Sequence, residues 1–382
     1  MTVELHSLRN SPMLSASAAA LPERVAWARD LPVRLPSEIL AVLEQRESVT
    51  LAHARQSAAD LRLAAAFTNV RPTSSRLPFS YQMIPGPLRR LAAGVIGRLQ
   101  RARQVSWASF PGWPLDLSAD VAADLVELPT VTFTRTPVLI THDIDSAEGL
   151  RNLNGLFLPI EEAAGMRSAN YIVPCAWPVD PGLARAALQR GHEIGVHGYD
   201  HANRTPFASD TERQARLEAG HRFARQYGGI GYRAPSLLRT KALMAGLETF
   251  YRYDSSIPTS GGPFPVPNNG CATARPWRFG RMWELPLSLP RDGSLRFLGY
   301  SPSEIGRLWR QTTLHIAESG GIVTLLTHCE GSFSGNPPML GEYRRFLEWV
   351  AADGRFECVL PATLVGRLDR LWPETCGAPP LG

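Results

Sequence analysis

Hydrophobic and polar positions follow two different patterns along the chain, and the change falls near residue 130. After it, short runs rich in aliphatic and β-branched residues alternate with longer stretches that have helical spacing. The runs expected to form strands are 137–141, 169–174, 192–196, 281–286, 321–327 and 356–360. The stretches expected to form helices between them are 181–190, 210–227, 302–318 and 341–351. This alternation is typical of α/β proteins with a parallel sheet or a barrel.

The segment before residue 130 has a different texture. Residues 1–20 are small and polar, which predicts a poorly ordered start, and 37–67 has helical spacing. Residues 71–87 contain several prolines and are expected to be irregular.

Residues 87–104 are expected to form a basic amphipathic helix. Its apolar positions are Leu88, Leu91, Val95, Ile96 and Leu99, and arginines occupy much of the remaining surface. Such a helix either lies on an anionic membrane or packs its apolar stripe against a domain. Packing is the commoner arrangement, and the sequence leaves both open.

Composition narrows the class of protein. The 382 residues are 44% hydrophobic and 20% charged, with a net charge of +5, which is ordinary for a globular chain. The basic residues are dispersed, so we expect no nucleic-acid partner. The five cysteines form no CxxC pair, and we found neither a signal-peptide pattern nor an apolar run long enough to span a membrane. A cytoplasmic protein, with a peripheral membrane contact through 87–104 as an option, is the expectation.

Three of these predicted strands, and a further short strand before Arg233, end in side chains that carry chemistry. The quoted ends are "THDIDS" from 141, "HGYDH" from 197, "GYRAPSLL" from 231 and "LLTHCEG" from 325. His197 and His201, with one carboxylate from 143–145, are a ligand set that suits a divalent transition metal. Asp143 and Asp145 are two apart and point the same way on an extended chain, so one can ligate while the other accepts a proton.

Several other hydrolase chemistries are excluded by missing motifs. The chain has no HExxH, no GxSxG and no HxE with PCxxC. It therefore lacks the signatures of thermolysin-type proteases, serine hydrolases with a nucleophile elbow, and cytidine deaminases.

Five motifs in order resemble a known family. "THDID", "HGYDH", "RAPS", "YDSS" and "LLTH" resemble the motif series of the NodB-type polysaccharide deacetylases, carbohydrate esterase family four. The resemblance covers 131–370 and implies a distorted barrel of seven or eight βα units. Residues 1–130 would then be a mainly helical extension, and 371–382 a C-terminal tail.

The family resemblance also assigns roles at the metal. It implies that Asp145, His197 and His201 bind a divalent ion, Zn²⁺ first, with Co²⁺, Ni²⁺ or Fe²⁺ as alternatives. Asp143 would be the catalytic base, oriented by Arg233. Because Ile144 separates the two aspartates, where most members have them adjacent, the base and ligand roles of Asp143 and Asp145 can be exchanged.

The resemblance further implies that His328 is the general acid, tuned by a carboxylate assigned to Asp254. Leu326 or Leu325 would line the pocket for the acetyl methyl group. Further candidates for contact with the substrate are Trp283, Tyr199 and Pro235. Asp200 is expected to lie behind the ligands, and His192 to be structural.

The activity implied is removal of an N-acetyl group, or an O-acetyl group, from a carbohydrate or glycan precursor, preferably an intracellular one. Three alternatives stay open: a cyclic amide or ureide hydrolase on the same barrel, a non-haem iron oxygenase, and a glycan-binding module without catalysis. The second uses the same two-histidine, one-carboxylate ligand type.

Overall fold

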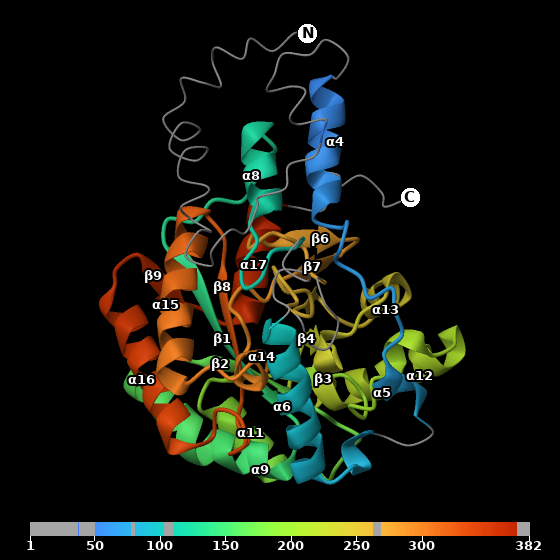
Figure 1. Cartoon of the computed structure of the whole chain (residues 1–382), viewed down its shortest axis with the longest axis vertical. Helices are drawn as coiled ribbons and strands as arrows, with labels where there is room; N and C mark the ends of the chain where they lie inside the picture. Colours follow the sequence, from blue (N-terminus) through green and yellow to red (C-terminus); the bar gives the residue numbers. More distant parts are fainter. Residues whose placement is uncertain (1–36, 38–49, 78–80, 103–109, 263–268, 373–382) are drawn as a thin grey trace.

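A nine-stranded sheet forms the centre of the computed structural model, which describes residues 37, 50–77, 81–102, 110–262 and 269–372 (Figure 1). The strand order is β6-β7-β5-β4-β3-β2-β1-β8, with β9 paired to β1. All pairs are parallel except β6 with β7. The strands are β1 Thr136–Ile144, β2 Ser168–Ile172, β3 Glu193–His197, β4 Gly231–Arg233, β5 Tyr253–Asp254, β6 Trp277–Phe279, β7 Met282–Glu284, β8 Val323–His328 and β9 Phe356–Cys358.

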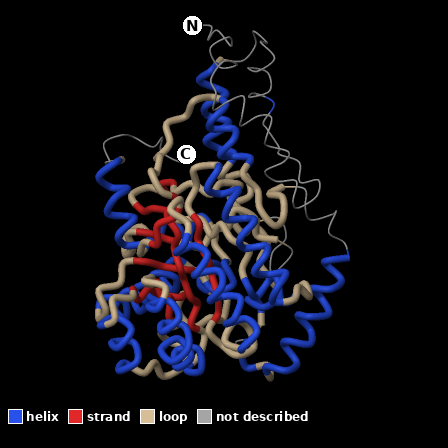
Figure 2. Tube along the Cα trace, turned by 90° about the vertical axis from the view of Figure 1, so that its left-hand side faces the viewer, coloured by secondary structure: helices blue, strands red, loops and turns tan. Residues whose placement is uncertain are grey.

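Helices surround the strands in both views (Figure 2). Before the sheet come α4 Leu51–Leu61, α5 Thr73–Arg76, η1 Tyr81–Met83, α6 Gly86–Ala102 and α8 Ser118–Leu125. Between the strands lie α9 Ala147–Asn152, η2 Leu153–Phe157, α10 Leu158–Ala163, α11 Pro181–Gln189, η3 Thr205–Phe207, α12 Asp210–Arg225, η4 Pro235–Leu237, α13 Lys241–Leu247, α14 Asp292–Phe297, α15 Pro302–Glu318 and α16 Pro337–Ala352. The last helix is α17 Pro361–Leu371.

The six strands expected from the sequence are confirmed as β1, β2, β3, β7, β8 and β9. The four expected helices are α11, α12, α15 and α16. Strands β5 and β6 were not expected, because two or three residues are too few to show a period-2 pattern.

The sheet is a distorted barrel that strand pairing alone does not close. The chain after β7 spans the gap: the Leu287 amide bonds the Ile257 carbonyl, and the Leu289 amide bonds the Thr324 carbonyl on β8 at 3.2 Å. Ser288 adds side-chain bonds to this strand, accepting from the Thr324 amide. An irregular segment therefore stands where a regular barrel has a further strand.

Alternation along β1 separates the inside of the barrel from its outer layer. Val138 and Ile140 belong to the main apolar cluster under the outer helices, whereas Leu139 belongs to an inner cluster that α17 closes with Val365 and Leu368. Side chains at odd positions of β1 thus face the barrel interior, and this places Asp143 there.

The N-terminal segment packs on the barrel within the described residues. The helix expected over 37–67 is observed as α4, which packs against α8 through Ala54 and Ala58. The Thr68 amide bonds the Arg239 carbonyl. The prediction for 1–20, and the tail from 373 onward, lie outside the described residues.

Within the described ranges, we find no helix that combines the length and the apolar character needed to cross a bilayer.

Candidate metal centre and active site

The polar strand ends meet at one edge of the sheet. Asp143 and Asp145 lie at the end of β1, His197 ends β3, Arg233 ends β4 and His328 ends β8. In the parallel register, Asp143 is level with His328, and His197 is level with Arg233. Carboxyl ends of parallel strands meet at one edge, so residues up to 185 positions apart become neighbours.

Asp145, His197 and His201 form a cluster that fits a divalent metal. The Asp145 Oδ1 atom lies 3.4 Å from His197 Nε2 and 3.5 Å from His201 Nε2, and the three ligand atoms all lie within 4.8 Å of one another. The Asp145 Oδ1 and His197 Nε2 atoms are buried and have no hydrogen-bond partner in the described part of the chain. Buried polar atoms rarely stay unpaired, and two nitrogens with one oxygen suit Zn²⁺.

The loop after β3 is shaped so that its two histidines converge. Gly198 has φ +67°, and a Cβ there would lie 2.4 Å from the Pro235 ring, so only glycine fits. His201 itself has φ +54°, and the ring centroids of His197 and His201 are 5.1 Å apart. Asp200, which lies between the two histidines in the sequence, is not part of the metal cluster. It accepts a hydrogen bond from the Ala202 amide at 3.0 Å instead.

Hydrogen bonds at the Nδ1 atoms leave both Nε2 atoms free to ligate. His197 Nδ1 lies 3.1 Å from the Arg233 carbonyl, to which only a protonated Nδ1 can donate. His201 Nδ1 lies 2.8 Å from the hydroxyl of Tyr81. Burial lowers the pKa of His197 in spite of the nearby Asp145, which favours the neutral imidazole that metals bind.

Tyr81 is a site residue that the sequence motifs do not indicate. It comes from η1 in the N-terminal segment and reaches His201 across 120 positions. We expect Tyr81→Phe to weaken Zn²⁺ binding by roughly tenfold, because partners of metal-bound histidines fix ring orientation and basicity. Competition with a chelating dye measures this. Tyr227→Phe, at a buried ring of the main core, is the control, and equal Zn²⁺ affinity in both variants would contradict the assigned role.

Asp143 is held by a fully buried arginine. Its Oδ1 accepts from Arg233 Nη1 at 3.0 Å, while Arg233 also donates to Thr141 Oγ1 and to the carbonyl and hydroxyl of Ser255. Burial alone would raise the pKa of Asp143, but His197 and Arg233 hold it below its ordinary value. Asp143 is therefore an ionised carboxylate that is held rigidly beside the metal cluster.

The carboxylate that tunes His328 is Asp292, not Asp254 as the motif series implied. Asp292 Oδ1 lies 2.7 Å from His328 Nδ1, and Oδ2 accepts from the His328 amide and from the Ser334 hydroxyl. Burial lowers the pKa of His328, but Asp292 outweighs it and raises the pKa to about 10. The imidazole is thus protonated at neutral pH.

Asp254 has a different environment. Its oxygens accept from the hydroxyl and the amide of Ser256, and burial raises its pKa. The Ser256 hydroxyl also accepts from the Ala234 amide beside Arg233. Asp254 therefore supports the chain around Arg233, and its assignment as the partner of His328 is wrong.

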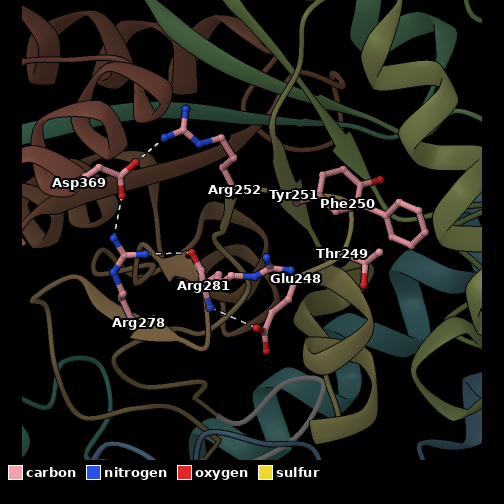
Figure 3. Close-up of a pocket in the computed structure, with 8 residues that line it drawn as sticks. All are labelled: Glu248, Thr249, Phe250, Tyr251, Arg252, Arg278, Arg281 and Asp369. Carbon is pink, nitrogen blue, oxygen red and sulfur yellow. Dashed lines mark hydrogen bonds and ion pairs between the residues drawn. The ribbon is translucent and has the colours of Figure 1, made fainter. Parts of the chain in front are cut away.

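The prediction that Trp283 contacts the substrate is also corrected. Trp283 is 3% exposed and packs in the inner cluster, with its indole N–H donating to Asp369 at 2.8 Å. Figure 3 shows Asp369 between Arg252 and Arg278. These residues line a cavity of about 570 Å³ beside residues that precede β5 and β7, away from the strand ends that carry the metal cluster.

The remaining substrate candidates occupy different positions. Leu326 is two residues before His328, so it faces the same side, and it clusters with Leu237 and Leu287. Leu325 instead packs in the main core, which leaves Leu326 as the leucine beside the site.

Pro235 is buried against Gly198, and Tyr199 is half-buried under the guanidinium of Arg216, 5.1 Å from its ring centroid. His192 bonds the Ser168 amide through Nδ1 at 3.0 Å, which suits the structural role expected of it.

Comparison with known proteins supports the fold. No protein-family model matches the sequence, and no curated protein matches it. The solved structure of Puue Allantoinase aligns with a TM-score of 0.52 and 13% identity, over 68% of this chain and 99% of that one. A probable polysaccharide deacetylase from Pseudomonas aeruginosa PAO1 aligns at 0.49 and 14%, over 62% of this chain and 92% of that chain. A family 4 carbohydrate esterase from Streptomyces lividans aligns at 0.40 and 12%, over 60% and 94%. The alignment with Puue Allantoinase shows a shared fold, and that fold is the distorted α/β barrel expected from the sequence.

Proposed function

We propose that the protein is a metal-dependent hydrolase that removes acetyl groups, N-acetyl first, from a carbohydrate or glycan precursor. The observation that carries the proposal is one edge of the sheet at which three groups meet. They are the metal cluster of Asp145, His197 and His201, the Asp143–Arg233 pair and the His328–Asp292 pair. A binding module would not need an ionised base and a protonated acid beside a metal cluster.

Asp145, His197 and His201 would hold the metal, with Zn²⁺ the best fit to two imidazoles and a carboxylate. A metal held there supplies Lewis-acid polarisation of the acetyl carbonyl and lowers the pKa of a water molecule. Tyr81 and the Arg233 carbonyl fix the two imidazole rings.

Two side chains of the protein would then carry out the proton transfers, one as base and one as acid. Asp143 accepts a proton from the attacking water, and Arg233 keeps the carboxylate in place and ionised. His328 donates a proton to the departing sugar nitrogen, or to the oxygen of an ester, and Asp292 keeps the imidazolium charged until then. The small apolar cluster around Leu326 gives the acetyl methyl group a dry surface.

Metal removal tests this proposal. Protein stripped with a chelator is expected to release acetate from N-acetylated oligosaccharides at least about a hundredfold more slowly, and added Zn²⁺ should restore the rate. The measurement is enzymatic detection of free acetate together with mass spectrometry of the saccharide, over a panel that includes nucleotide-linked and lipid-linked acetylated sugars.

Two controls separate the alternatives. Ring opening of a cyclic amide without acetate release would replace deacetylation by a cyclic amide hydrolase activity on the same site. Tight saccharide binding without acetate release in the presence of any metal tested would support a binding module and overturn the proposal. Consumption of oxygen on addition of Fe²⁺ would point to an oxygenase instead.

A further inference from the structure

Helix α6 presents its large apolar side chains to solvent. Leu88, Leu91 and Leu99 are 58%, 67% and 58% exposed, and Val95 and Ile96 are 49% and 45% exposed. These five are half of the ten large apolar side chains that the described residues expose, and Met83 in the preceding turn is another at 74%. Packing of this stripe against the domain, the commoner arrangement for such a helix, is therefore not what the described part of the structure shows.

The opposite side of α6 is the one that packs. Gly97 is buried, and a Cβ at this position would lie 2.1 Å from the carbonyl oxygen of Phe297 in α14. A glycine therefore lets the two backbones touch, and the helix is fixed with its aliphatic face outward. Figure 1 shows α6 beside α14.

The sequence around α6 carries only positive charge. Residues 61–115 contain no aspartate or glutamate. The arginines in this range are Arg62, Arg71, Arg76, Arg89, Arg90, Arg98, Arg101 and Arg103. On α6, Arg98 is exposed and Arg89 is half-buried. An exposed aliphatic face flanked by arginine, on a segment whose sequence has no acidic residue, complements an anionic lipid surface.

The same helix borders the active site. It packs on α14, whose first residue is Asp292, the partner of His328. It follows η1, whose Tyr81 contacts His201, and Arg89 of α6 lies 5.9 Å from the Tyr81 ring centroid. A surface that contacts α6 would therefore lie beside the mouth of the site.

We propose that α6 is an interfacial helix that seats the protein on an anionic lipid bilayer, with the active-site edge next to the lipid headgroups. The aliphatic side chains enter the headgroup boundary, and the arginines pair with lipid phosphates. The inference goes beyond the proposed hydrolysis and does not depend on it, because lipid binding and acetate release are measured separately.

Sedimentation of the full-length protein with vesicles tests the proposal. Vesicles of phosphatidylcholine alone are compared with vesicles that contain phosphatidylglycerol. We expect partitioning to be at least about tenfold stronger on the anionic vesicles, and Leu91→Gln with Leu99→Gln to weaken it by roughly tenfold or more. The matched control is Leu188→Gln with Leu371→Gln, which removes two exposed leucines from α11 and α17 and should leave partitioning unchanged.

Three results would overturn the proposal. One is equal vesicle binding by the α6 variant, the control and the wild type. Another is a dimer in solution that the α6 variant dissociates, since a second copy would then cover the face. The third is weak labelling of the side chains of 88–99 by a carbene probe in a lipid-free monomer, since another part of the same chain would then cover the face. Acetate release from a short soluble saccharide should be the same in the α6 variant and the wild type, so loss of lipid binding is distinguishable from loss of hydrolysis.

Discussion

Asp143→Asn is expected to lower kcat for acetate release by about a thousandfold, the typical effect of removing a positioned general base. An amide at this position still accepts the Arg233 hydrogen bond but cannot accept a proton from water. The metal content should not change, because Asp145, His197 and His201 remain. Steady-state kinetics combined with metal analysis of the purified variant makes the measurement.

Asp145→Asn is the matched control, two positions further along the same strand end. It should lose most of its metal as well as its activity, because the Asp145 oxygen is the one that approaches both imidazoles. Asp143 approaches only His197 among these, at 3.5 Å, and its other oxygen is engaged by Arg233. If Asp143→Asn instead loses the metal and Asp145→Asn retains it, the base and ligand roles are exchanged.

Stability gives a further check on Asp143. The variant leaves the Arg233 charge buried without its counter-charge, which should lower the free energy of unfolding by about 2 kcal/mol. Urea titration followed by circular dichroism measures this. Activity that falls no more than the folded fraction would argue against a catalytic role for Asp143.

The site residues that the sequence predicts correctly are those at the ends of strands. "THDID", "HGYDH", "RAPS" and "LLTH" each follow a strand recognisable from its apolar run or its flanking motif. Parallel pairing then fixes which ends meet: Asp143 with His328, and His197 with Arg233. Local patterns sufficed there because sheet geometry converts strand ends into neighbours without further information.

The residues that sequence reasoning missed are placed by irregular segments. Asp292 begins a six-residue helix that follows the irregular segment across the barrel gap. The path of that segment sets the distance between Asp292 and His328. Tyr81 lies in a single turn outside the barrel motifs. Neither position has a spacing or a periodicity that points to its partner.

Trp283 illustrates the reverse error. The family resemblance made Trp283 a candidate for contact with the substrate, but a residue on a barrel strand can also point into the packed interior. Trp283 takes the inner face, where Arg278 lies over its ring at 4.4 Å and Asp369 accepts its N–H. Composition alone does not decide between these faces.

The pH dependence of the reaction should identify the partner of His328. With a pKa raised to about 10, the imidazole is protonated and competent as an acid below that pH, and activity is lost as the pH rises through it. Asp292→Asn removes the main cause of the rise, so the alkaline limb of the kcat/KM profile should move to lower pH by roughly two units. At pH 9 this corresponds to about a tenfold loss relative to neutral pH.

Asp254→Asn is the matched control for this prediction, because it also neutralises a buried aspartate at a strand end. Its carboxylate bonds Ser256 rather than His328, so the alkaline limb should stay where it is in the wild type. His328→Ala should abolish the limb altogether and lower the rate at all pH values, since no acid remains to titrate. If the alkaline limb moves in Asp254→Asn and not in Asp292→Asn, the carboxylate that raises the pKa of His328 is Asp254. A merely structural contribution of Asp292 would lower the rate evenly across the pH range, because the protonation of His328 would then be unaffected.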